Sequence, residues 1–391
     1  MKIVHVITRL IVGGAQENTL LSCEGQHRAG HDVTLITGPA IGPEGSLMQR
    51  AGAAGFRLDV VDDLRRAIHP RRDWAAFLFL ARRFKQLQPD IVHTHSSKAG
   101  IIARWAARQA RVPVVIHTIH GLAFTASTSR LVNTAYRLAE KYTAPISTRI
   151  VCVADAMRDQ SLAGGVGRFD QYVTIYSGME TLPFLQPPVP RESVRQQFAI
   201  QPDHIVVGTI ARLFDLKGHD DLLTLAPALC REFPRLRFMW VGDGSLRPRF
   251  EAQIRQMGLA DRFILTGLVP PSRIPELVNA MDILVHPSRR EGLARALVQG
   301  ALAGKPVITY DIDGNREALI PGRTGFLLPP FDQDTLRQSL TTLLSDPPRR
   351  HVMGDAGRKF VIDRFDTSRM VAALDKLYEQ CLHERAGGAG S

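Results

Sequence analysis

Short apolar runs rich in β-branched residues alternate along the whole chain with longer stretches whose apolar positions recur at helical spacing. We expect strands at residues 2–8, 32–37, 91–95, 112–119, 149–154 and 172–178, and again at 204–212, 236–242, 262–267, 282–288, 306–311 and 325–330. Strands that are apolar nearly throughout are typical of parallel sheets covered by helices on both faces. The pattern therefore predicts an α/β protein with two doubly wound parallel sheets.

A proline-rich segment, "TLPFLQPPVPRES" at residues 181–193, separates the two sets of strands. Its clustered prolines disfavour a helix or a central strand, so we interpret it as a stiff linker. We place an N-terminal domain at residues 1–182, the linker at 183–193 and a C-terminal domain at 194–366. An amphipathic helix at 367–383 is expected to join the N-terminal domain, and a loose tail follows it.

Composition narrows the class of protein. A chain of 391 residues with 45% hydrophobic content fits two soluble domains, and it holds no apolar run of the roughly 20 residues that span a bilayer. The N-terminus lacks the apolar core of a signal peptide, and the four cysteines show no C-x-x-C spacing. We therefore expect a cytoplasmic protein without disulfides.

The net charge of +11 is concentrated in the first half, since residues 1–187 hold 22 Lys and Arg against 14 Asp and Glu. Such an excess suits nucleic acid, an anionic membrane or a phosphorylated substrate. Charge alone does not choose among these three partners.

In the first half of the chain, glycines and histidines stand at the carboxyl ends of strands. Open α/β sheets bind their ligands at these strand ends. Gly13 and Gly14 would let a ligand approach the backbone at a helix N-terminus, although a tight turn alone also explains them. We assign His120, at the end of another strand, to the site, and we interpret His93 as structural. No acidic or cysteine partner stands at ligand spacing from His93 and His95, so we predict no metal site there.

Cationic side chains follow strands in the second half. Arg212 and Lys217 flank the loop after one strand, and two fixed cations there suit a phosphate ligand, with surface ion pairing as the alternative. Gly242 closes a further strand in a tight turn. Asp311 and Asp313 have the spacing of a metal-binding pair, which we treat as a coincidence because the chain supplies cations where such a site would hold Mg²⁺.

A series of motifs runs in order along nearly the whole chain. They are "GGAQ", "PDIVHTH", "HG" at 120–121, "YSGME", "ARLFDLKG", "VGDG", "LTGLVP", "HPSRREGLARALVQGALAGKPVI" and "GRTGFLLPP". In this order they resemble the retaining family 4 glycosyltransferases of the GT-B fold. The resemblance implies two Rossmann-like domains that face each other across a cleft, with the acceptor bound on the N-terminal side and a nucleotide sugar on the C-terminal side.

The resemblance also implies roles for individual residues. Arg212 and Lys217 would hold the donor diphosphate. Glu291 would bond hydroxyls of the transferred sugar, and His120 would lie beside that sugar near the acceptor. The other expected donor contacts are the backbone around Leu268 and Val269 at the base and the backbone of Gly292, Leu293 and Ala294 at the phosphates. Gly13, Gly14 and Gly242 are expected elsewhere in the site.

Two positions depart from the family pattern. Gln299 stands where a second acidic residue, usually the one that binds ribose, is expected, and Ala294 replaces a usual glycine. Eight residues of helix from Glu291 to Gln299 would rise about 12 Å, roughly the span from a sugar ring to a ribose. Because Gln both donates and accepts hydrogen bonds, we expect altered donor affinity or preference.

The implied reaction is transfer of a sugar from an NDP-sugar, with uracil favoured as the base, to a hydroxyl with retention at the anomeric carbon. Arg212, Lys217 and a helix start near Gly292 would stabilise the charge on the leaving diphosphate, so we expect no metal and no cofactor. Glu291 and His120 complete the expected catalytic set, and no covalent nucleophile is expected.

The acceptor side offers "LRRAIHPRRDWAAFLFLARRFKQL", in which arginines surround aromatic residues. This stretch predicts either contact with an anionic membrane or a core helix with Phe77, Leu80, Phe84 and Leu87 facing inward. In both cases the positive charge favours a lipid-linked saccharide or a cell-envelope glycan as the acceptor.

Other functions fit the residues less well. A nicotinamide dehydrogenase would need a G-x-G-x-x-G fingerprint and its ribose-binding acid, which the chain lacks. No helix-turn-helix, zinc finger or RNP-like aromatic pair indicates a nucleic-acid partner. A catalytically weak protein that binds nucleotide sugars stays an alternative, and the sequence does not predict an oligomeric state.

Overall fold

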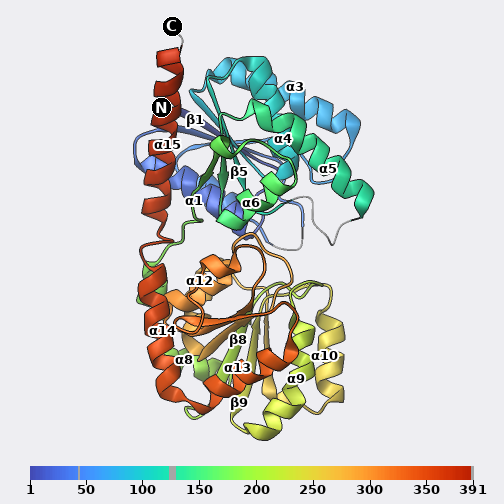
Figure 1. The fold of residues 1–391 in the computed structure, drawn as a ribbon, viewed down its shortest axis with the longest axis vertical. Helices are drawn as coiled ribbons and strands as arrows, with labels where there is room; N and C mark the ends of the chain where they lie inside the picture. Colours follow the sequence, from blue (N-terminus) through green and yellow to red (C-terminus); the bar gives the residue numbers. More distant parts are fainter. Residues whose placement is uncertain (43–44, 123–128, 389–391) are drawn as a thin grey trace. The chain divides into compact units, whose positions relative to one another are not determined.

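The computed structural model describes residues 1–42, 45–122 and 129–388. The chain divides into two compact units: unit 1 comprises Met1–Met179 and Asp366–Ser391, and unit 2 comprises Glu180–Phe365 (Figure 1). Each unit contains a parallel sheet with helices on both faces, which confirms the predicted fold class.

The sheet of unit 1 has the strand order β3-β2-β1-β4-β5-β6-β7. Its strands are β1 (Lys2–Ile7), β2 (Asp32–Thr37), β3 (Arg57–Val60), β4 (Ile91–His95), β5 (Val114–Ile119), β6 (Arg149–Cys152) and β7 (Tyr172–Thr174). Its helices are α1 (Gly14–Arg28), α2 (Met48–Ala53), α3 (Pro70–Leu87), α4 (Ser97–Ala110), α5 (Arg130–Thr143), α6 (Asp155–Ala163) and α15 (Thr367–Gly388).

Alternation along the strands of unit 1 places apolar side chains in the cores on both faces of the sheet. Val4 and Val6 of β1 pack with α3 and α4. Ile3 belongs to the opposite core, which includes Leu21 of α1 and Leu374 of α15. Figure 1 shows α15 beside α1, with α3 and α4 on the other side of the sheet.

The sheet of unit 2 has the strand order β10-β9-β8-β11-β12-β13. Its strands are β8 (Ile205–Ile210), β9 (Leu236–Val241), β10 (Phe263–Gly267), β11 (Ile283–His286), β12 (Val307–Tyr310) and β13 (Gly325–Leu328). Its helices are α7 (Leu182–Leu185), α8 (Arg191–Gln197), α9 (His219–Glu232), α10 (Arg247–Gln256), α11 (Ile274–Ala280), α12 (Arg295–Leu302), α13 (Gln333–Ser345) and α14 (Pro347–Val361).

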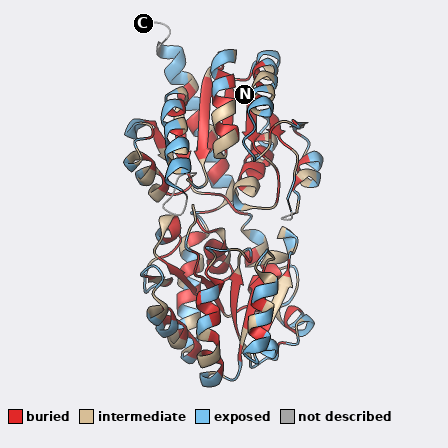
Figure 2. Ribbon diagram, turned by 90° about the vertical axis from the view of Figure 1, so that its right-hand side faces the viewer, coloured by how far each residue is buried: buried red, intermediate tan, exposed pale blue. Residues whose placement is uncertain are grey.

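The two faces of the unit 2 sheet carry different helices. Ile283 and Val285 of β11 lie in a core with residues of α9, α10 and α13. Leu284 points the other way and contacts Gly300 of α12, where a Cβ would lie 3.0 Å from the Leu284 side chain. The central strands of both units are buried, whereas the outward faces of the helices are exposed (Figure 2).

One strand of unit 1 was missed by the sequence analysis. β3 lies at the sheet edge and is at most half-buried, with Arg57 and Asp59 among its four residues. Charged residues are common on edge strands, where they discourage pairing with another chain. The apolar runs that identified the other strands are therefore absent from β3.

The prediction of a helix-free linker at 183–193 was wrong. α7 begins before Pro183, which lies in its first turn, and α8 begins directly after Pro190. The first turn of a helix needs no N–H donor from the chain, so proline is favoured there. The whole proline-rich segment lies in unit 2, which starts at Glu180.

The expected loose tail was also wrong in part, because α15 continues past residue 383 to Gly388. Glu384 in this extension pairs with Arg149 of β6 at 2.8 Å and accepts a hydrogen bond from Gln380 at 3.0 Å. These contacts, together with the helix propensity of Ala386, favour continuation of the helix.

Candidate active site

Glu291 lies at the centre of a polar cluster in unit 2, in the loop between β11 and α12. Its Oε1 lies 2.5 Å from Nζ of Lys217 and 2.8 Å from Nε2 of His286. Its backbone N–H donates to Oδ2 of Asp313 at 2.7 Å. These three contacts hold the carboxylate in a defined place at the carboxyl end of the sheet.

Glu291 is ionised in this cluster. Burial alone raises its pKa, because desolvation favours the neutral acid, but the charge of Lys217 and the hydrogen bond from His286 outweigh burial and hold the pKa well below its usual range. Since a carboxylate only accepts hydrogen bonds, Nε2 of His286 carries the proton of this pair. The fixed, charged carboxylate can accept hydrogen bonds from hydroxyl groups of a ligand.

The loop that carries Lys217 packs directly against the loop after β11. Gly218 has a φ of +74°, and a Cβ there would lie 1.9 Å from the carbonyl oxygen of Pro287. The backbone N–H of Arg289 donates to the carbonyl of Leu216 at 2.8 Å. Glycine is therefore required for the close approach that brings Lys217 to its carboxylate partner.

Arg212 and Gly242 follow the neighbouring strands β8 and β9. The guanidinium of Arg212 is exposed and lies 5.0 Å from the ring centre of Phe214. Gly242 has a φ of +139°, and a Cβ there would lie 2.2 Å from the carbonyl oxygen of Ala211. The backbone crossing at Ala211 thus explains this glycine without a ligand, and a donor contact there stays a prediction.

Leu268 and Val269 follow β10 at the same edge of the sheet, because the carboxyl ends of parallel strands share one edge. Leu268 is 51% exposed, and Val269 is half-buried. The structure therefore places an accessible segment after β10, and contact of the backbone around Leu268 and Val269 with a base stays a prediction.

The helix after Glu291 starts later than the sequence suggested. α12 begins at Arg295, and Ala294 is its N-cap, so the residues from Glu291 to Ala294 are not helical. Gln299 is half-buried and lies four residues into the helix, a rise of about 6 Å. The expectation of eight helical residues between Glu291 and Gln299 was therefore wrong.

The segment between Glu291 and α12 is built from backbone contacts. The carbonyl of Gly292 accepts a hydrogen bond from the N–H of Gly314 at 3.0 Å, and the side chains of Leu293 and Ala294 are buried. The expected helix start near Gly292 is thus displaced by three residues, and its contact with phosphate stays a prediction.

Asp311 and Asp313 have different hydrogen-bond partners in this structure. Asp311 accepts a hydrogen bond from Nε of Arg316 at 3.0 Å, whereas Asp313 accepts the backbone N–H of Glu291. Asp313 therefore serves to shape the loop that carries the candidate carboxylate.

The candidates Gly13, Gly14 and His120 belong to unit 1. Gly13 is the N-cap of α1, and a Cβ there would meet only the end of the Gln16 side chain. His120 follows β5, with its Nε2 3.1 Å from Nδ1 of His95. These residues stand at the carboxyl ends of β1 and β5, as the strand pattern predicted.

His93 has the structural role that the sequence analysis assigned to it. It is buried, with Nδ1 2.5 Å from the hydroxyl of Tyr378 and Nε2 2.6 Å from Oγ1 of Thr118. Both ring nitrogens are thus used within the core of unit 1.

The sequence analysis missed His286, which orients Glu291. The residue ends a strand and precedes Glu291 by five positions, so its place beside the carboxylate depends on the turn between them. The motif "HPSRREG" contained it, but a single histidine at a strand end gave no signal that separated it from a core residue.

Helix α3 fits the core-helix alternative. Leu80 and Phe84 are buried, and Phe77 and Leu87 pack against the same core. Trp74 and Phe79 on this helix are instead 62% and 40% exposed, and Trp74 stacks on Phe77 with ring centres 5.1 Å apart.

Helix α5 presents an apolar face that the sequence analysis also missed. Leu131, Leu138 and Tyr142 lie on one side at helical spacing, and Leu131 and Tyr142 are 86% and 70% exposed. The basic residues of the same helix are Arg130, Arg137 and Lys141. Among the described residues, no helix is both long and apolar enough to cross a bilayer.

Two family models match the chain. The model for "Glycosyl transferases group 1" matches residues 190–360, which include Lys217 and Glu291. The model for "Glycosyl transferase 4-like domain" matches residues 13–178, which include His120. Together the two matches span most of both units.

Characterised relatives cover nearly the full length. The UDP-Gal:alpha-D-GlcNAc-diphosphoundecaprenol alpha-1,3-galactosyltransferase of Escherichia coli is 27% identical over 382 residues, 97% of this chain and 96% of that protein. The alpha-D-kanosaminyltransferase of Streptomyces kanamyceticus is 23% identical over 367 residues, 90% of this chain and 95% of that protein.

Solved structures share the fold. Anabaena HepE in complex with UDP-glucose has a TM-score of 0.83 at 21% identity over 97% of this chain and 100% of that chain. Sucrose-phosphate synthase from Thermosynechococcus elongatus has a TM-score of 0.80 at 19% identity over 98% and 100%. With two parallel-sheet units of GT-B type and both family models in order, this chain belongs to the group 1 glycosyltransferases with a family 4-like N-terminal domain.

Proposed function

We propose that the protein transfers a sugar from a UDP-sugar to a hydroxyl of a lipid-linked or cell-envelope saccharide, with retention at the anomeric carbon. The observation that carries the proposal is the ionised Glu291 between Lys217 and His286 at the carboxyl end of the unit 2 sheet. Its carboxylate suits sugar hydroxyls, and the cation beside it suits a phosphate. The UDP and UDP-glucose complexes of HepE support the choice of UDP.

The leaving diphosphate gains negative charge as the bond to the sugar breaks. Arg212 and Lys217 stand after β8, where they would neutralise that charge. One well-placed donor of this kind is worth roughly 3–4 kcal/mol in the transition state. The departing phosphate would take the proton of the acceptor hydroxyl, so the proposal includes no covalent enzyme intermediate.

Lys217 would change partners during the reaction. It is paired with Glu291 at 2.5 Å, and an incoming diphosphate would offer it a second anion. His286 would keep Glu291 in place through the 2.8 Å hydrogen bond, so the carboxylate stays available to the sugar. This exchange couples donor binding to the position of the lysine.

We propose that transfer needs no metal ion. The two acidic side chains with metal-like spacing are engaged elsewhere, Asp311 by Arg316 and Asp313 by the backbone of Glu291. Cationic side chains would perform the charge neutralisation that Mg²⁺ provides in other transferases.

The acceptor side favours a lipid-linked saccharide at an anionic membrane surface. The exposed apolar face of α5 is flanked by Arg130, Arg137 and Lys141, the composition of a helix that lies in a bilayer interface. The name of the Escherichia coli relative specifies a diphosphoundecaprenol acceptor, which supports this class. Peripheral contact would bring the enzyme to its acceptor.

Vesicle sedimentation tests the membrane contact. Leu131→Glu with Leu138→Glu should reduce binding to vesicles that contain an anionic phospholipid, whereas Val352→Glu, at an exposed position on α14, should not. Equal binding by both variants, or no binding by the natural protein at low salt, would contradict the membrane proposal.

A panel of UDP-, GDP- and ADP-sugars tests the central proposal. We expect UDP-sugars to raise the melting temperature and to be hydrolysed or transferred with EDTA present. Binding of UDP-sugars without any turnover would indicate a binding protein. The proposed mechanism would be contradicted if activity depended on added Mg²⁺ and were unchanged in the variants Arg212→Ala and Lys217→Ala.

A further inference from the structure

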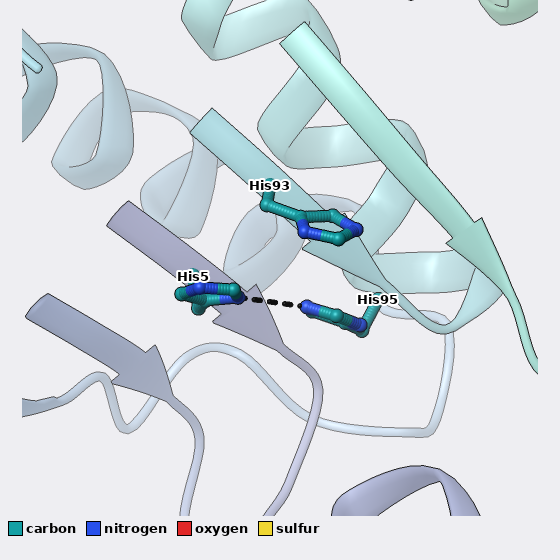
Figure 3. A group of neighbouring side chains, drawn as sticks. All are labelled: His5, His93 and His95. Atoms are coloured by element: carbon teal, nitrogen blue, oxygen red, sulfur yellow. Dashed lines mark hydrogen bonds between the residues drawn. The ribbon is translucent and has the colours of Figure 1, made fainter. Parts of the chain in front are cut away.

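Three buried histidines lie side by side in the sheet of unit 1 (Figure 3). His5 comes from β1, and His93 and His95 come from β4, which pairs with β1 in parallel with His5 opposite His93. All three lie on the face of the sheet that α1 and α15 cover, since they alternate with Val4, Val6 and Val92 of the other core.

A continuous hydrogen-bonded series, here called the histidine chain, runs through this core. Nε2 of Gln26 lies 3.0 Å from Oδ1 of Asp375, and Oε1 of Gln26 lies 2.7 Å from Nε2 of His5. Nδ1 of His5 lies 3.0 Å from Nε2 of His95. Nδ1 of His95 then lies 3.1 Å from Nε2 of His120, the candidate residue after β5.

The chemistry of the donors and acceptors fixes the direction of every hydrogen bond in the histidine chain: each group donates to the neighbour on its Asp375 side. The Asp375 carboxylate only accepts, so the Gln26 amide must turn its NH₂ group toward it and its oxygen toward His5. That oxygen only accepts, so Nε2 of His5 carries a proton. A neutral His5 then accepts at Nδ1 from Nε2–H of His95, and His95 in turn accepts at Nδ1 from Nε2–H of His120.

Burial keeps the two inner rings neutral, as this direction requires. Desolvation lowers the pKa of His5 to about 4, although the hydrogen bond to Gln26 opposes the shift. Desolvation also holds the pKa of His95 well below its usual range, and the neighbouring His93 and His5 add to the effect. Each inner ring therefore has one proton to donate and one lone pair to offer.

A metal ion is the competing interpretation, because ligand nitrogens of His5, His93 and His95 lie within 4.8 Å of one another. Every one of these six ring nitrogens already has a hydrogen-bond partner: those of His93 contact Tyr378 and Thr118, and those of His5 and His95 belong to the chain. An ion would have to break several of these bonds in a core of matched donors and acceptors.

We propose that the histidine chain fixes His120 with its proton on Nε2 and its lone pair on Nδ1, so that His120 accepts a hydrogen bond from a substrate hydroxyl. Gln26 and Asp375 are then positioning residues that act on the site from helices α1 and α15, through the core on the same face of the sheet. The role of His120 toward substrate rests on the proposed glycosyl transfer, whereas the orientation of its protons does not.

Asp375→Asn tests the direction of the hydrogen bonds in the histidine chain, because the substitution leaves the side-chain volume almost unchanged. The new amide can donate as well as accept, so the Gln26 amide is free to turn and the whole series loses its preferred direction. We expect imidazole ¹H–¹⁵N spectra to show His120 protonated on Nε2 in the natural protein and a mixture of both forms in Asp375→Asn. His120→Gln assigns the signals.

Steady-state kinetics of the same variants distinguish a positioning role of Asp375 from a general effect of the substitution on core packing. Asp375→Asn should lower kcat roughly three- to tenfold, the scale of one net hydrogen bond, with the KM for the UDP-sugar unchanged. The double variant Gln26→Glu with Asp375→Asn should recover kcat, because the new carboxylate accepts from His5 and restores the direction. Thr118→Val, which removes a partner of His93 outside the chain, is the matched control and should leave the His120 tautomer unchanged.

Two results would overturn the proposal. One is a His120 proton that stays on Nε2 in Asp375→Asn, and the other is Zn²⁺ or Co²⁺ binding that shifts the signals of His5, His93 and His95. Because the spectra need no substrate, a protein that transfers no sugar would refute the proposed function and leave the test of the histidine chain intact.

Discussion

Lys217 and Glu291 lie 74 positions apart in the sequence and meet at 2.5 Å between two loops of unit 2. The lysine stands after β8, and the glutamate stands after β11, the strand that pairs with β8 in the sheet. The parallel arrangement thus places a cation and a carboxylate together at one edge, the pair that we propose meets the phosphates and hydroxyls of a nucleotide sugar.

Lys217→Ala should lower turnover by about 10²–10³-fold, because the leaving diphosphate loses a fixed cation and Glu291 loses the charge that lowers its pKa. Steady-state kinetics with EDTA present measure the effect. Lys359→Ala, at an exposed position on α14, is the control and should retain full turnover. Full turnover in Lys217→Ala as well would show that this lysine does not meet the diphosphate.

Gln299→Glu restores the acidic residue that the family pattern expects on α12. A charged acceptor strengthens hydrogen bonds from ribose hydroxyls, so KM for the UDP-sugar should fall about tenfold while kcat changes by less than about threefold. Michaelis curves for the variant and the natural protein provide the measurement. An unchanged KM would mean that residue 299 does not touch the donor.

Gly218→Ala should destabilise unit 2 by about 2–4 kcal/mol, since the new Cβ combines an unfavourable positive φ with overlap on the Pro287 carbonyl. Gly258 also has a positive φ, +68°, but a Cβ there meets nothing within 4 Å. Gly258→Ala should therefore cost only about 1–2 kcal/mol. Chemical denaturation compares the two, and equal losses would show that the Lys217 loop can move away from β11 freely.

His219→Leu should improve stability most at acidic pH. Burial lowers the pKa of His219 to about 3, and neither ring nitrogen has a hydrogen-bond partner among the described residues. The unfolded chain binds this proton below about pH 6.5, whereas the folded chain does not until about pH 3. Stability is thus fully present above pH 6.5 and is lost as pH falls, by up to about 1.4 kcal/mol per pH unit for one such group.

Melting temperatures at pH 7.5 and pH 5 check this expectation. The advantage of His219→Leu over the natural protein should grow at the lower pH, while His351→Gln, at an exposed position, should follow the natural protein. A constant difference at the two pH values would indicate that His219 gains its proton in the folded state as easily as in the unfolded chain.

The strands could be predicted because buried parallel strands need apolar residues on both faces, and those runs are visible in the sequence. β3 was not predicted because an edge strand is partly exposed and does not require apolar residues on both faces. The helices next to Pro183 and Pro190 were not predicted for a different reason. Proline disfavours a helix interior, but Pro183 lies in the first turn of α7 and Pro190 is the N-cap of α8, and composition alone does not show where a helix begins.

The candidate site could be predicted in its main residues, since Lys217 and Glu291 stand in motifs that mark strand ends. The start of α12 at Arg295 could not, because Glu291 to Ala294 keep helical periodicity without helical backbone. The histidine chain could not be predicted from the sequence either. The pattern in "VHTH" places His93 and His95 on one face, but their partners depend on the register between β1 and β4.

Helix α15 has a consequence for the synthesis of the protein. Met370, Leu374 and Tyr378 complete a core with strands from the first 180 residues, and Asp375 anchors the amide of Gln26. Unit 2 is one continuous stretch and can fold once residue 365 has left the ribosome. Unit 1 is complete only after α15, which is synthesised after unit 2, so unit 1 finishes folding later than the unit that follows its strands in the sequence.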